Sequence, residues 1–152
     1  MELTDLLRVR AGEILDEAVA ALRRAHLPHY EAAGGEVTRR RLAALLALTA
    51  ESVTHRQAAE VVEFAKKLAR ERHAAGFDLS ELQVAFNVLE ESIWNRIFAE
   101  LAPSELARAL GLVSTVLGLG KDALARTYVE LAGAGAAPSL DLRAAFGGTD
   151  GV

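Results

Sequence analysis

The chain has 152 residues, of which 51% are hydrophobic and 25% charged, and its formal net charge at pH 7 is −4. This length is sufficient for one domain with a hydrophobic core. The sequence contains no cysteine, which excludes thiol catalysis, thiolate metal sites and disulfide bonds. The negative net charge argues against a nucleic-acid partner. The low aromatic content, 5%, and the abundant alanine favour closely packed helices over a β-sandwich.

The start of the chain and its hydropathy pattern predict a cytoplasmic protein. Residues 1–5 are acidic rather than basic and then apolar, so we expect no secretory signal. The longest uncharged run, residues 109–120, is well short of the roughly 18 residues that a transmembrane helix requires. We therefore expect no membrane association.

The first part of the chain is predicted to form two helices separated by a loop. Apolar spacing favours a helix over residues 2–26, which ends there because Pro28 disfavours helix in the residue that precedes it. Two glycines indicate a loop over residues 29–35. A second helix is expected over residues 37–51, with leucines on its inner face.

Two further helices follow, each with a capping pattern at its start. Residues 54–57 form a capping box that predicts the start of a third helix, and Gly76 is expected to end it in the left-handed conformation. A fourth helix is predicted to extend to Leu101, with Asp78 or Ser80 as its N-cap.

The last predicted helix, residues 104–131, is apolar on several sides and must be surrounded by other elements. The face from Leu106 to Leu131 is predicted to pack in the core. We interpret a second apolar face and a seam of small residues as a surface for a second layer or for a second copy of the chain. The residues of this surface are Gly111, Leu112, Val116, Gly118, Leu119 and Ala123.

These elements together predict an all-α fold. We expect a single bundle of about five helices, mostly antiparallel, that forms a sensor or dimerisation domain over residues 1–133. A flexible C-terminal tail is expected over residues 134–152. A globin-like arrangement without haem is an alternative topology for the same helices.

The flank of the fourth helix carries a candidate surface for a ligand or partner. Asn87, Glu91, Trp94 and Phe98 lie there, about 100° from the core face of that helix. A tryptophan beside polar groups can anchor a partner helix or form the floor of a small pocket. The alternative, in which the two aromatic residues only pack beneath a neighbouring helix, is equally open.

Lys121 interrupts the main apolar face of the last helix and belongs to the same candidate surface. A lysine at such a position usually extends its ammonium group to solvent. Otherwise it needs a buried carboxylate, for which Glu90 on the fourth helix is the candidate.

The sequence offers no pattern for a metal, a cofactor or catalysis. The four histidines form neither HExxH nor the Glu-x-x-His pairs of di-iron bundles. No Ser, His and acid cluster has a diagnostic spacing, so we expect a protein that is not an enzyme. Gly34 and Gly35, followed by the arginines of residues 39–41, would suit an anion, although a solvated basic helix start is the favoured interpretation.

Residues 69–82, with the sequence ARERHAAGFDLSEL, resemble the helical N-terminal sensor domain of RsbRD-type proteins, the RsbT co-antagonist family of stress-response regulators. The resemblance continues to Phe86 and Trp94 and covers residues 3–131. The matched positions are packing and turn residues, so the resemblance implies no catalytic or ligand residue. Because no output domain follows in this sequence, it implies a module that acts on a separate partner of the kinase, anti-sigma or cyclase type.

The leading hypothesis is a non-catalytic bacterial signalling module that forms a homodimer and responds to a small effector. The alternative is a globin-like domain that binds haem or an apolar ligand.

Overall fold

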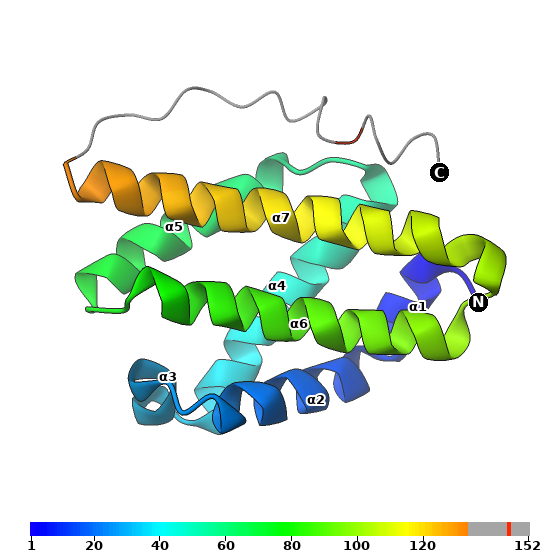
Figure 1. Ribbon diagram of the computed structural model, residues 1–152, viewed down its shortest axis with the longest axis horizontal. Coiled ribbons are helices and arrows are strands. Elements are labelled where there is room, and N and C mark those ends of the chain that lie inside the picture. Colours follow the sequence, from blue (N-terminus) through cyan, green and yellow to red (C-terminus); the bar gives the residue numbers. More distant parts are fainter. Residues whose placement is uncertain (134–145, 147–152) are drawn as a thin grey trace.

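The computed structural model describes residues 1–133 and Phe146. These residues form helices and no strand, which confirms the all-α prediction, although the helices number seven rather than about five (Figure 1). The helices are α1 (Leu3–Val9), α2 (Ala11–Arg24), α3 (Pro28–Ala33), α4 (Gly35–His55), α5 (Ala59–Ala74), α6 (Leu79–Glu100) and α7 (Leu106–Leu131), with a 3-10 turn, η1 (Pro103–Glu105), before α7. Apart from Phe146, the predicted tail over residues 134–152 lies outside the described residues.

Two predictions for the first 35 residues need correction. The helix expected over residues 2–26 is divided into α1 and α2 at Arg10, whose backbone leaves helical geometry with φ −98° and ψ 12°. The loop expected over residues 29–35 contains α3, because Pro28 occupies the first turn of a helix, where its missing N–H group costs nothing. Gly34, with φ +86°, then turns the chain into α4.

The capping box predicted at residues 54–57 is also wrong, because α4 continues to His55. Thr54 Oγ1 donates a hydrogen bond to Ala50 O in the last turn of α4 and caps no new helix. Such bonding to the preceding turn is the common alternative to capping for threonine. Arg56, with φ 52°, ends α4, and α5 begins at Ala59.

The turn between α5 and α6 follows the prediction more closely. Gly76 has φ +86°, which confirms the left-handed C-cap. Phe77 N donates to Arg72 O at 2.9 Å across this turn, as in a Schellman motif. Asp78 stands at the N-cap position of α6 in an extended conformation, but its carboxylate accepts from Ser80 Oγ and no side chain caps the helix.

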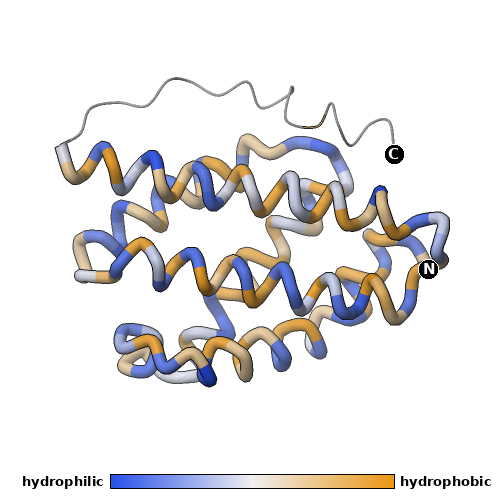
Figure 2. The backbone as a smooth tube through the Cα atoms, in the orientation of Figure 1, coloured by the Kyte–Doolittle hydropathy of each residue, from blue (hydrophilic) through white to orange (hydrophobic). Residues whose placement is uncertain are grey.

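The long helices α6 and α7 lie side by side and antiparallel, and α2 lies on the other side of α6 (Figure 1). Helix α4 crosses behind them and contacts α2, α7, α1 and α5, so the fold is not a simple antiparallel bundle (Figure 1). Apolar and polar residues alternate along each helix, as expected where one side is buried (Figure 2). Fully buried side chains of α6 and α7 form the centre of the core, among them Phe86, Leu89, Ile93, Val113, Leu117 and Leu124.

Helix α7 buries most of its two predicted apolar faces within one chain, although Leu131, at the end of the face predicted to pack in the core, is 42% exposed. Leu112, Val116, Leu119 and Ala123, on the second face, are all buried, and α5 packs closely against α7. Their close packing is therefore within the monomer, and they are not exposed to a second copy. The small-residue seam, by contrast, remains partly exposed at Gly111 and Gly118.

Candidate functional site

Seven of the residues proposed from the sequence for a partner or a second copy of the chain lie at exposed or partly exposed positions of α6 and α7. We call this surface the α6–α7 face and define it as Asn87, Glu91, Trp94, Phe98, Gly111, Gly118 and Lys121. The α6 residues recur every three or four positions and so share one stripe of that helix. On α7, Gly111, Gly118 and Lys121 lie seven and three positions apart and so share one side of the helix. The contact between Lys121 and Asn87 joins the two stripes.

Lys121 makes polar contacts across the α6–α7 face. Its Nζ donates a hydrogen bond to Asn87 Oδ1 at 2.9 Å and lies 3.8 Å from Glu90 Oε1. The side chains of Lys121 and Glu90 are only 28% and 14% exposed. Of the two alternatives for Lys121, the structure shows the one with a carboxylate partner on α6.

Glu90 of α6 is a largely buried carboxyl group beside Lys121 of α7. Its burial raises the pKa of Glu90 above the ordinary value, while Lys121 and a hydrogen bond from Ser114 act in the opposite direction. Because burial has the larger effect, further covering of the α6–α7 face would favour the protonated form.

The two aromatic residues of the face differ in their surroundings. Phe98 is 60% exposed, so it does not pack beneath a neighbouring helix. Trp94 is partly buried, and its Nε1 is shielded from solvent without a hydrogen-bond acceptor. An indole N–H in this state is an unmet donor next to an exposed aromatic ring.

Gly118 has no packing partner in the described part of the chain that requires a glycine. A Cβ atom at this position would meet no atom within 4 Å outside the helix's own nearby backbone. Glycine inside a helix costs about 1 kcal/mol relative to alanine. No contact among the described residues of one chain therefore offsets this cost at Gly118.

The basic segment after Gly35 does not form a single anion site. Arg39 pairs with Asp16 of α2, and Arg40 is exposed. Only Arg41 points inward, toward a cavity that the sequence analysis did not anticipate. Nothing in the local sequence distinguishes Arg41 from its neighbours except its position one residue before the buried Leu42.

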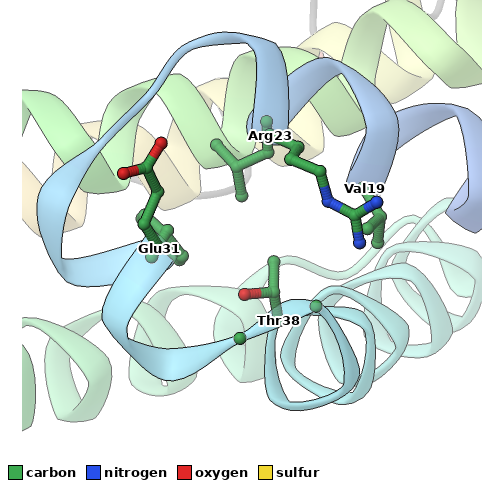
Figure 3. Close-up of a pocket in the computed structure, with 8 residues that line it drawn as sticks. Val19, Arg23, Glu31 and Thr38 are labelled. Atoms are coloured by element: carbon green, nitrogen blue, oxygen red, sulfur yellow. The ribbon is translucent and has the colours of Figure 1, made fainter.

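A cavity of about 170 Å³ lies between α2, α3 and the start of α4. Arg23 and Glu31 stand on opposite sides of its opening, and Val19 and Thr38 line its wall (Figure 3). The Arg23 guanidinium lies so close to Gly35 that a Cβ atom there would be 2.5 Å from Nη2. The guanidinium is the far end of an exposed, flexible side chain, so it can move aside for a Cβ atom at this position.

The histidines lie apart from one another, each beside a different residue. His29 Nδ1 lies 2.8 Å from Glu81 Oε1, and the His29 ring stacks on Phe77 at a centroid distance of 4.6 Å. His73 contacts the edge of Tyr128. Within the described residues, no group of three or more His, Asp or Glu side chains is placed to hold a metal ion.

A family model described as the RsbT co-antagonist protein RsbRD N-terminal domain matches residues 12–141. The chain belongs to this family. Membership in the RsbRD N-terminal domain family places it among the N-terminal domains of stress-response signalling regulators and confirms the resemblance drawn from residues 69–82. Neither a curated protein nor a solved structure matches the chain.

The motif that carried the resemblance has a structural role in this RsbRD N-terminal domain. Phe77 is buried, its ring contacts His29 and Tyr30 of α3, and its carbonyl accepts a 2.9 Å hydrogen bond from Tyr128 Oη of α7. The Arg72 guanidinium lies 5.6 Å from the centre of the same ring. The turn after α5 therefore joins α3, α5 and α7.

The described helices give no support for a membrane-spanning segment, since none of them is both long and apolar enough to cross a bilayer.

Proposed function

We propose that the chain is a non-catalytic, cytoplasmic sensory module that forms a homodimer and transmits its signal through the α6–α7 face. In this proposal the receiving protein is a separate signalling component of the kinase, anti-sigma or cyclase type, and nucleic acid and membrane are not partners. The observation that carries the proposal is the exposed Phe98 of α6, together with the partly exposed glycines of α7, in a domain of a stress-signalling family.

Three features of the α6–α7 face favour a second copy of the chain as the first partner. Gly118 keeps the surface of α7 low, so another helix can approach closely. Phe98 supplies an aromatic side chain that loses water on contact. A two-fold contact would use each of these residues twice, which is the usual way in which a modest patch gives a stable dimer.

The effect of the dimer on signalling would pass through the polar contacts between α6 and α7. Covering the face removes water from Glu90, whose pKa burial already raises, and so changes the charge that faces Lys121. A small effector that shifts the packing of these helices would change the exposure of Phe98. Binding of the effector would then change the surface that the partner protein contacts.

The test compares the oligomeric state of two glycine variants. Gly118→Leu should convert a dimer into a monomer at tens of micromolar protein, measured by light scattering after size exclusion, because the larger side chain blocks close approach. Gly12→Leu, on α2, is the matched control, because a Cβ atom at Gly12 also meets no atom within 4 Å. A wild-type chain that is strictly monomeric at this concentration would contradict the proposal, as would equal dissociation of both variants.

The alternative is a globin-like domain that binds haem or an apolar ligand. Its apolar-ligand version has more support than its haem version. The cavities next to α4 have apolar walls, but no histidine is among the described residues that line them. Expression with added haem, followed by an absorbance spectrum, decides the haem version, since a bound haem produces a Soret band.

A further inference from the structure

A second cavity, of about 200 Å³, lies where α4, α5 and α6 meet. An apolar protein cavity of about 150 Å³ is large enough to bind benzene, so this one has room for a ring or a short chain. Apolar side chains form most of its wall: Leu42, Leu45, Phe64, Leu68, Ala85 and Phe86. We call it the α4–α5 cavity.

Two arginines from different helices face this apolar space. Arg41 reaches it from α4 and Arg72 from α5. Arg41 Nη1 is shielded from solvent and has no hydrogen-bond partner among the described residues. Burial and, second to it, the charge of Arg72 lower the pKa of the Arg41 guanidinium. A guanidinium nitrogen that is shielded from solvent without a hydrogen-bond partner is costly, and a second cation on the same cavity raises that cost.

The protein itself supplies little negative charge to this pair. Among the described residues that line the α4–α5 cavity, Glu71 is the one carboxylate, and its side chain is 52% exposed. Its Oε2 lies 3.9 Å from Arg72 Nη1, and solvent screens the exposed carboxylate. Glu71 is thus the ion-pair partner of Arg72, whereas Arg41 Nη1 has no hydrogen-bond partner among the described residues.

The other polar groups of the cavity also suit an anion. Burial raises the pKa of Tyr30 to about 12, so its phenol stays protonated and can donate a hydrogen bond. Thr38, which is buried, contributes a hydroxyl group to the same wall. Both residues also line the cavity between Arg23 and Glu31, so the two spaces adjoin.

We propose that the α4–α5 cavity binds a small carboxylate with an apolar body, of the size of benzoate or octanoate. The carboxylate pairs with Arg41 and Arg72, because a guanidinium fork matches its two oxygens. The apolar body packs against Phe64, Leu68 and Phe86, which a free phosphate would leave without contact. This inference rests on the proposed sensory function, in which the ligand of the α4–α5 cavity is the effector. The cavity lies outside the α6–α7 face, and ligand binding in it does not depend on dimerisation there.

The first experiment titrates the full wild-type chain with defined probes by calorimetry. Benzoate and octanoate should bind saturably, benzyl alcohol at least about tenfold more weakly, and benzylammonium without measurable heat. Benzyl alcohol binding as tightly as benzoate would show an apolar cavity that does not select an anion. Inorganic phosphate binding as tightly as benzoate would show a plain anion site. Either result, or no saturable binding of any carboxylate, overturns the proposal.

The second experiment uses neighbouring arginines as a matched pair. Arg41→Met keeps the apolar stem and removes the unpaired charge, so benzoate affinity should fall about tenfold or more while the midpoint of thermal unfolding without ligand stays the same or rises. Arg40→Met, at an exposed position, should leave both quantities unchanged. If Arg41→Met lowers the unfolding midpoint and keeps benzoate affinity, Arg41 is structural and the proposal is wrong.

A third measurement needs no variant and holds even where Arg41→Met fails to fold. Benzoate added to the isotopically labelled wild-type chain should shift the amide signals of Phe64, Leu68 and Ala85 and leave that of Trp94 unchanged. Shifts confined to the α6–α7 face would place the ligand elsewhere and refute the site. Since the oligomeric state is measured separately, loss of this site and loss of the dimer are distinguishable.

Discussion

Gly120 of α7 lies directly against Phe86 of α6. A Cβ atom built on Gly120 would stand 2.8 Å from Phe86 Cε2 and 3.1 Å from Val61 Cγ1 of α5. Glycine at this position lets α7 pass close to both helices at the centre of the core. Two residues earlier, a Cβ atom on Gly118 would meet nothing within 4 Å, so the two glycines of one helix serve different purposes.

The contrast predicts opposite effects of alanine at these two positions. Gly120→Ala should destabilise the fold by about 1–3 kcal/mol, because overpacking of the core outweighs the gain in helix propensity. Gly118→Ala should stabilise the monomer by up to about 1 kcal/mol, since only the propensity changes. Urea unfolding, at protein concentrations low enough for the chain to be monomeric, measures the free energy of unfolding of both variants. Equal effects of the two substitutions would show that α7 is free to shift away from Phe86.

Lys121→Met tests the contact between α6 and α7. The substitution removes the cation from Asn87 and Glu90, and we expect a loss of about 1–2 kcal/mol in the free energy of unfolding at pH 7. The charged form of Glu90 loses its partner, whereas the neutral form does not need one. The loss should therefore shrink as the pH falls and Glu90 becomes protonated.

Lys66→Met is the control for this prediction, because Lys66 forms a surface pair with Glu63. Such exposed pairs contribute little, so this variant should differ from the wild type by less than about 0.5 kcal/mol. If Lys121→Met is as mild as this control at pH 7, the Lys121 ammonium is solvated and its contacts with α6 carry little energy.

Glu100 should make stability depend on acid pH. The hydrogen bond from Arg10 is the largest cause that lowers the pKa of the Glu100 carboxyl, and the two side chains approach to 2.6 Å. A carboxyl whose pKa is lower in the folded than in the unfolded state stabilises the fold above the unfolded value. This stabilisation is lost as the pH falls through the folded pKa.

Glu100→Gln should accordingly be less stable than the wild type at pH 7, and the difference should disappear in strong acid. Thermal unfolding at a series of pH values measures this. Glu60→Gln, an exposed position on α5, serves as the control and should change the unfolding midpoint little at pH 7. A Glu100→Gln midpoint equal to that of the wild type at pH 7 would show that the pair with Arg10 is not formed in solution.

Much of the local structure could be predicted because it depends on short stretches of sequence. The 3.6-residue spacing of apolar side chains predicts the long helices, and the glycine at position 76 ends α5 in the left-handed conformation, as expected. Errors occurred where a residue suits two local structures. Pro28 can end a helix or begin one, and Thr54 can cap a helix or bond to its preceding turn.

The candidate site was predictable in its members but not in its environment. Helical spacing placed Asn87, Trp94 and Phe98 on one flank, yet only the packed helices leave Phe98 exposed and Trp94 half-buried. The same holds for Arg41, which differs from Arg40 only in the direction that α4 gives it.

The sequence by itself determined that this protein is all-helical, where most helices lie, and to which family it belongs. These properties depend on neighbouring residues and on a motif of turn and packing positions. Only the tertiary structure decided that Leu112 and Val116 are interior, that Lys121 meets Glu90, and that the α4–α5 cavity exists. The reason is that burial and pairing arise between helices far apart in the chain, whose arrangement no local pattern encodes.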